Sequence, residues 1–212
     1  MHIVPRRLVQ CCVSLGLLVA IVPDRPAAAT ATVEHLLTTG QSAHAFFHAV
    51  DSTGCVITDV FIVIGNSVVR DGNGNAVGSL ASVDIDRYDV CRGLFLYQGI
   101  GSTSTFQFSM DSKLSQARFT GTIPCFEFIS STPLTAIIDL TWVANGDVTH
   151  DAVATHFGSP PGFVINSIFV GDIRPARAQG TVSDGTTQFL IGPTSDAEMD
   201  LSKTGDITVQ RN

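Results

Sequence analysis

The sequence contains few basic residues, and this scarcity excludes some classes of partner. Twelve lysines and arginines stand against 19 aspartates and glutamates in 212 residues, which gives a formal net charge of −7. Lysine occurs only at Lys113 and Lys203. An acidic chain of this kind repels the phosphate backbone of nucleic acids and anionic lipid headgroups. We therefore expect no nucleic-acid partner.

Long apolar segments are missing after the N-terminal region. Residues 8–22 read LVQCCVSLGLLVAIV, with Arg6 and Arg7 before them and the small residues Ala27 to Ala29 after them. A short positive region, a brief apolar region and an A-x-A site are typical of a secretory signal peptide. We expect cleavage near Ala29 and a secreted, periplasmic or cell-surface location. No second stretch approaches the roughly 20 residues of a membrane helix, so we expect no membrane insertion after cleavage.

Helical periodicity is also missing, and the pattern is that of strands. Apolar and polar residues alternate in QSAHAFFHAV (41–50) and LTAIIDLTW (134–142), and turn-forming sequences such as DSTG and SPPG separate the strand-like segments. Alternation with a period of two indicates strands with one buried face. We predict an all-β chain that folds as a single antiparallel β-sandwich of jelly-roll type, with about 8 to 10 strands. Its divisions are 1–29 (signal peptide), 30–40 (N-terminal link) and 41–212 (sandwich domain).

The segment DGNGN at 71–75 raises the possibility of a calcium loop. Its Asp and Asn residues occupy the first, third and fifth positions of an EF-hand-type loop. Such a loop also needs glycine at the sixth position and glutamate at the twelfth, where this chain has Ala76 and Ser82. Asn and Gly together favour a hairpin turn. We therefore interpret the segment as a turn and assign no cofactor and no metal to it.

Two pairs of side chains are expected to share a strand face. His44 and His48 lie about 13 Å apart on an extended strand, which is too far for both to bind one ion. Asp84 and Asp86 lie about 7 Å apart on an extended strand, near the carboxylate separations of glycosidases. Alternation with Val83 and Ile85 makes a solvent-facing strand the simpler interpretation. No G-x-S-x-G nucleophile motif is present, and we assign no catalytic residue.

The segment 144–176 is expected to be one long irregular connection. Long connections in compact domains are uncommon and often functional, so we expect a site there if there is one. The weak metal candidates and the residues of a possible ligand loop are His150, Asp151, His156, Phe157 and Phe163.

Aromatic residues suited to sugar stacking are scarce. The chain has one tryptophan and two tyrosines, Trp142, Tyr88 and Tyr97. Trp142 alternates in register with apolar residues and is expected on the core face. Few aromatic platforms then remain for a carbohydrate.

Three cysteines remain after signal cleavage, and an oxidising compartment allows them one disulfide. Cys55 begins one apolar strand and Cys91 ends the strand that returns through the DGNGN turn. We predict that Cys55 and Cys91 form the disulfide. Cys125 is expected to be a buried thiol and not a reactive one, with pairing between two molecules as the alternative.

The segments DSTGCVITDVFIVI, VDIDRYDVCRG, DLTWVANG and RPARAQGTV resemble a group of small secreted bacterial β-rich proteins of unknown activity. The resemblance covers most of residues 41–190 and implies a fold and an export route, but no reaction. The leading functional hypothesis is a non-enzymatic extracellular or envelope-associated interaction protein that binds a protein or a glycan. The alternatives are a carbohydrate-binding module and, third, a hydrolase.

Overall fold

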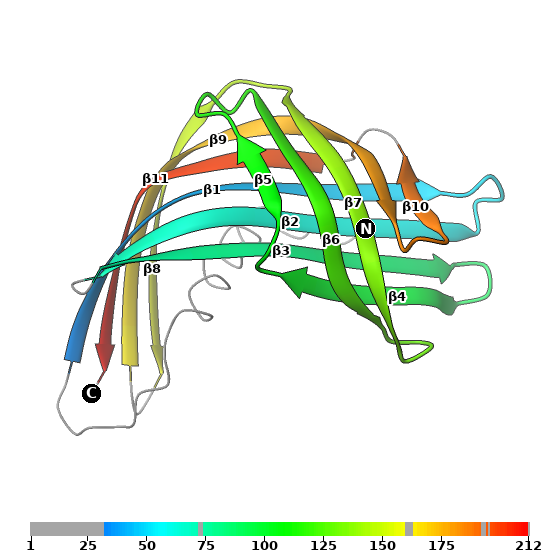
Figure 1. Ribbon diagram of the computed structural model, residues 1–212, viewed down its shortest axis with the longest axis horizontal. Helices are drawn as coiled ribbons and strands as arrows, with labels where there is room; N and C mark the ends of the chain where they lie inside the picture. Colours follow the sequence, from blue (N-terminus) through cyan, green and yellow to red (C-terminus); the bar gives the residue numbers. More distant parts are fainter. Residues whose placement is uncertain (1–31, 72–73, 160–162, 192–193, 195, 212) are drawn as a thin grey trace.

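The structure is a computed structural model that describes residues 32–71, 74–159, 163–191, 194 and 196–211. These residues form strands and turns and include no helix, so none of them forms a membrane-spanning helix. The expected signal peptide at 1–29 and Gly72 and Asn73 of the DGNGN turn lie outside the described residues. The predicted all-β, antiparallel fold class is confirmed (Figure 1).

The described residues form eleven strands, one more than the upper end of the predicted range. They are β1 (Thr32–Val50), β2 (Val56–Asp71), β3 (Gly74–Asp89), β4 (Leu94–Thr103), β5 (Gln107–Met110), β6 (Gln116–Glu127), β7 (Thr132–Ala144), β8 (Thr149–Ser159), β9 (Phe163–Ser183), β10 (Gln188–Ile191) and β11 (Asp196–Arg211).

All eleven strands belong to one antiparallel sheet that closes on itself. The order β9-β11-β1-β2-β3-β4-β6 continues through β7, which pairs with both β6 and β9. The pairing therefore returns to β9 and forms a closed ring of strands. In detail this order differs from a jelly roll, because β1 to β4 are successive neighbours joined by hairpins. Strands β5, β8 and β10 each pair with one ring strand only.

The ring is flattened, so that two parts of the sheet pack face to face. Figure 1 shows β6 and β7 crossing in front of β1, β2 and β3. Fully buried side chains from both parts form one core, including Ile62, Ile85, Phe119 and Leu140. Trp142 of β7 is fully buried, as predicted, and its Nε1 donates a hydrogen bond of 2.8 Å to the His44 carbonyl oxygen of β1.

Two seams of the ring require glycine. At the first seam, where only three residues of β4 pair with β6, a Cβ atom on Gly101 would lie 2.2 Å from the Pro124 carbonyl oxygen. At the second, Gly180 of β9 has a φ angle of 145°, and a Cβ atom there would lie 2.0 Å from the Asp139 carbonyl oxygen of β7. A larger residue would push the paired strands apart at both places.

Two segments that the sequence suggested were irregular are strands. The interpretation of 30–40 as a link is wrong from Thr32 onward, because β1 begins there and pairs with β11 and β2. The interpretation of 144–176 as one irregular connection is also wrong. Residues 149–159 form β8, and β9 runs from 163 to 183 between β8 and β11. Backbone hydrogen bonds on both sides of β9 hold its first half extended despite its polar and glycine residues.

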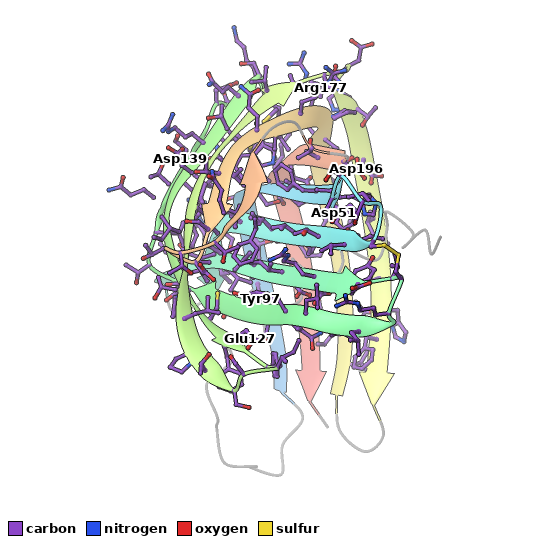
Figure 2. The ribbon with its side chains drawn as sticks, turned by 90° about the vertical axis from the view of Figure 1, so that its right-hand side faces the viewer. Asp51, Tyr97, Glu127, Asp139, Arg177 and Asp196 are labelled. Atoms are coloured by element: carbon purple, nitrogen blue, oxygen red, sulfur yellow. A yellow bond between two sulfur atoms is a disulfide. The ribbon has the colours of Figure 1, made fainter. Side chains whose placement is uncertain are left out.

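The predicted disulfide joins Cys55 to Cys91, with a Cα–Cα distance of 5.3 Å. Strands β2 and β3 pair along their full length from Val56 opposite Asp89 to Asp71 opposite Gly74, which confirms the predicted hairpin. The bridge therefore closes the open end of this hairpin, and Figure 2 shows it as a yellow bond on the same side of the molecule as Asp51. Cys125 is a free, buried thiol, as predicted. A disulfide is consistent with an oxidising compartment.

Several acidic residues serve the turns. Asp51, Asp111 and Asp184 each accept hydrogen bonds from backbone N–H groups of the turn that follows them. The Ser115 hydroxyl and nearby backbone N–H groups lower the pKa of Asp111 to about 2. Some of the acidic residues of this chain therefore stabilise its turns.

Glu127 has the same role at the β6–β7 turn and is almost fully buried. It accepts hydrogen bonds from the backbone N–H groups of Gln98, Ile129 and Ser130, at 3.3, 2.9 and 2.5 Å, and from the Ser130 hydroxyl. Burial alone would raise the pKa of Glu127, but the bonds from Ser130 and these N–H groups outweigh it and lower the pKa to about 2.

We expect Glu127→Gln to reduce the free energy of unfolding at pH 7 by about 1–3 kcal/mol, because the neutral amide accepts these bonds more weakly. A carboxylate whose pKa is lowered by folding stabilises the protein above its unfolded pKa, and that stability is lost as the pH falls toward the folded value. The difference from wild type should therefore shrink between about pH 4.5 and pH 2. Urea unfolding at pH 7 and pH 3 measures it. A difference equal at both values would contradict the capping role.

Candidate functional site

Strands β1 to β4 carry a mixed apolar and acidic surface on the side away from the core. Alternate residues of these strands point outward, and the pairing register aligns them into three rows across the strands. We call this surface the outer face. The first row is Phe46, Phe61, Asp84, Ile100 and Phe126; the second is His48, Asp59, Asp86 and Gln98; the third is Val50, Ile57, Tyr88 and Phe95.

The first row exposes large apolar side chains. Ile100 is 47% exposed and Phe126 41% exposed, and these two residues lie directly opposite each other on β4 and β6. Phe128, 51% exposed, packs edge-on against Phe126 with ring centroids 5.3 Å apart. Phe95 of the third row is also exposed and contacts Tyr88. Contiguous exposed apolar side chains are typical of binding surfaces.

The second and third rows share a hydrogen-bonded group that is spread over three strands. His48 Nδ1 of β1 lies 2.7 Å from Asp59 Oδ1 of β2. The Tyr88 hydroxyl of β3 donates a hydrogen bond of 2.9 Å to Asp59 Oδ2. Asp59 therefore has a fixed orientation, because each of its oxygens has a partner on a neighbouring strand.

The carboxylates of Asp84 and Asp86 have fewer stabilising partners than that of Asp59. Burial raises the pKa of Asp84, and the negative charge of Asp86 raises it further. Burial also raises the pKa of Asp86; a hydrogen bond with Gln98 opposes this effect and the charge of Asp59 adds to it. Asp86 lies directly opposite Asp59, and its Oδ1 atom is buried without a hydrogen-bond partner among the described residues. Like charges directly opposite each other destabilise a sheet.

We expect Asp84→Asn to stabilise the protein at pH 7 by about 0.5–1 kcal/mol, because it removes a carboxylate whose charge is disfavoured by burial and by the nearby charge of Asp86. An Asp whose pKa is raised by folding contributes most stability below its unfolded pKa, and this contribution is lost as the pH rises through the folded value. The gain should therefore disappear near pH 3. Thermal unfolding at both pH values measures it, with Asp147→Asn as an exposed control of equal charge change. A loss of stability at pH 7 would show that Asp84 has a stabilising partner.

The pair His48 and Asp59 has no nucleophile joined to it among the described residues. His48 and Asp59 form the base-and-carboxylate pair of many catalytic triads. In the described part of the chain, however, the only hydrogen-bond partner of His48 is Asp59, and no hydroxyl or thiol completes a triad. The arrangement is suited to binding by hydrogen bonds, charge and apolar contact.

The metal candidates suggested by the sequence do not converge. His150 and His156 lie on one face of β8, six positions apart, and Asp151 lies on the other face. Each histidine instead pairs across the strands: His150 Nδ1 contacts Asp172 of β9, and His156 Nδ1 lies 2.7 Å from Asn166 Oδ1. The three weak candidates therefore do not come together as one group of possible metal ligands.

The two phenylalanines of the possible ligand loop lie in strands. Phe157 belongs to β8 and is 54% exposed. Phe163 begins β9, where it pairs with Ser159 and Arg211. Both phenylalanines therefore belong to strands of the sheet and not to one long irregular loop.

One other cluster brings possible ligand atoms together. Cys55, Asp89 and Cys91 are the only group of three histidine, cysteine or acidic residues in the described ranges whose ligand atoms all lie within 4.8 Å of one another. Both cysteine sulfurs are already joined in the disulfide, so this cluster does not offer thiolate ligands.

The position of Asp59 opposite Asp86 could be worked out from the sequence. A hairpin that turns between Asp71 and Gly74 places Asp59 opposite Asp86 by counting back along both strands, and the structure has this register. The neighbouring Ile100 and Phe126 could not be found in this way, because β4 and β6 are not joined by a hairpin.

Comparison with known proteins gives little further information. No family model and no curated protein matches the sequence. Among solved structures, one similar chain is a crystal structure at 2.00 Å resolution of a putative AttH from Nitrosomonas europaea, with 8% sequence identity and a TM-score of 0.33. The match covers 90% of this chain and 57% of that chain, so the present chain spans little more than half of that protein. A TM-score of this size supports no inference about fold or function.

Proposed function

We propose that the mature chain is an exported, non-enzymatic binding protein and that the outer face contacts its partner. The observation that carries this proposal is the pair Ile100 and Phe126, which lie side by side and exposed, with Asp84 directly opposite Ile100. Asp86 and Asp59 follow in the second row of the same face. The apolar side chains would gain free energy from burial against a partner. The polar rows would determine which partner fits.

The export route is part of the proposal. It is supported by the N-terminal sequence, with Arg6 and Arg7 before a short apolar region, and by the disulfide between Cys55 and Cys91. Both features are typical of proteins that leave the cytoplasm.

A carbohydrate-binding module is the second candidate. Phe126, Phe128 and Phe95 expose aromatic rings close to Asp86 and Gln98, and exposed rings beside hydrogen-bonding groups also suit a sugar. The two candidates use the same face and differ in the chemistry of the ligand.

A binding panel with matched variants tests the proposal. The panel consists of a glycan array and a random peptide library displayed on phage, each probed with the mature protein. We expect at least one class of ligand to bind, and Ile100→Ser to weaken that binding by about tenfold or more, since a buried apolar side chain contributes about 1.5–3 kcal/mol.

Ile137→Ser is the matched control. Ile137 lies on β7 and is 48% exposed, against 47% for Ile100, but it lies outside the three rows of the outer face. Binding affected equally by both substitutions, or by neither, would contradict the outer face as the site. Turnover of a substrate on a hydrolase panel would contradict the non-enzymatic role.

A further inference from the structure

We infer that the outer face accepts a cationic side chain of a partner protein, and that this side chain is an arginine flanked by apolar residues. The inference rests on the proposed function, since it uses the same face. It goes further in naming the chemistry of the partner.

The first step is the arrangement of negative charge. Asp59 and Asp86 lie directly opposite each other on β2 and β3, and Asp84 lies two residues from Asp86 on the same face. The described Arg and Lys residues that form ion pairs do so elsewhere, with Asp89, Asp139 and Asp172. Among the described residues, His48 is the one titratable cation that contacts this group, and it contacts only Asp59. Asp84 and Asp86 therefore have no ion-pair partner within the described part of the chain.

The second step is the spacing of the carboxylates, which does not fit a metal ion. Carboxylate oxygens that bind one Ca²⁺ ion each lie about 2.3–2.6 Å from it, so they lie within about 5 Å of one another. Asp59, Asp84 and Asp86 do not meet this condition as a group, because the only described trio within 4.8 Å is Cys55, Asp89 and Cys91. A larger cation with several donors fits the wider spacing.

The third step is the apolar surround. Phe61 and Ile100 lie on either side of Asp84 in the first row. An arginine presents five N–H donors in a planar fork, and its methylene stem and guanidinium plane pack well on apolar and aromatic side chains. Apolar residues beside that arginine would reach Ile100 and Phe126, both about half exposed. The negative charge and the apolar side chains of the outer face therefore match one kind of partner segment, an arginine flanked by apolar residues.

The test uses the displayed peptide library with the intact mature protein. Peptides are selected on wild type after depletion on Asp84→Asn/Asp86→Asn, and we expect the selected sequences to carry arginine next to apolar residues. Each is then synthesised with the arginine replaced by citrulline, which keeps the shape and removes the charge. We expect citrulline to weaken binding by roughly tenfold or more, as for loss of a hydrogen bond to a charged group.

Matched variants separate this inference from the proposed function. Asp84→Asn should weaken binding of the arginine peptide, whereas Asp147→Asn, at an exposed position outside the face, should leave it unchanged. Selected peptides without a cationic residue, or equal binding of the citrulline form, would overturn the inference. The inference would also be overturned if no peptide bound while a glycan bound to wild type and lost its binding on Ile100→Ser. In that case the proposed function would stand. Thermal unfolding of each variant confirms that it is folded.

Discussion

Removal of the Cys55–Cys91 bridge is expected to lower the free energy of unfolding by about 4 kcal/mol. The bridge joins residues 36 positions apart, and closing a loop of this size restricts the unfolded chain by about that amount on the chain-entropy estimate. For a domain of this size the melting temperature should fall by about 8–16 °C. Thermal unfolding with and without a reductant, and of Cys55→Ser/Cys91→Ser, measures the effect.

Cys125→Ala is the control for the effect of reductant. The Cys125 thiol is buried and contacts the Ile123 carbonyl oxygen at 3.3 Å. Burial raises the pKa of Cys125, which disfavours the reactive thiolate. This variant should therefore lose as much stability on reduction as wild type does. If it no longer responds to reductant, Cys125 takes part in the bridge and the assigned pairing is wrong.

Trp142→Ala is expected to cost about 3–5 kcal/mol, the range for large aromatic side chains removed from a core. Trp142 is fully buried between the two parts of the sheet, and its Nε1 hydrogen bond to the His44 carbonyl oxygen links β7 to β1. Urea unfolding followed by circular dichroism measures the loss. Because the sequence contains one tryptophan, the fluorescence of the wild-type protein reports on this position alone.

Trp142→Phe separates packing from the hydrogen bond. Phenylalanine keeps most of the apolar contact and lacks the N–H donor, so the His44 carbonyl loses this partner. We expect a smaller cost, about 1–3 kcal/mol. A Trp142→Ala variant as stable as Trp142→Phe would show that the ring contributes little packing between β7 and β1.

The sequence predicted features that depend on neighbouring residues. Alternation predicted the strand around Trp142 and its core-facing side chain, and the turn at 71–75 predicted the hairpin that brings Cys55 to Cys91. It also placed Asp84 and Asp86 on one face. Side-chain period and hairpin register are set locally, so a single sequence contains them.

Features set by distant pairing were not predicted. The segment 149–159 has alanine, threonine and histidine at many positions and shows no clear buried face, because β8 pairs on one side only and most of its residues are at least partly exposed. The first half of β9 is held by β8 and β11 together. The pairing of Ile100 with Phe126 likewise depends on the closing of the ring. Long-range hydrogen bonding overrides local preference in such strands.

The pairing of β1 with β11 also has a consequence for the order of folding. Residues of the first described strand pair with those of the last, from Thr32 opposite Arg211 to Phe46 opposite Asp196. Contacts between parts so distant in the sequence form slowly, because a long stretch of chain must first be brought together. The β2–β3 hairpin needs no such search and can form first, with its cysteines already close. A newly made chain should therefore form the β2–β3 hairpin and its disulfide first, and close the ring of strands only when β11 has paired with β1.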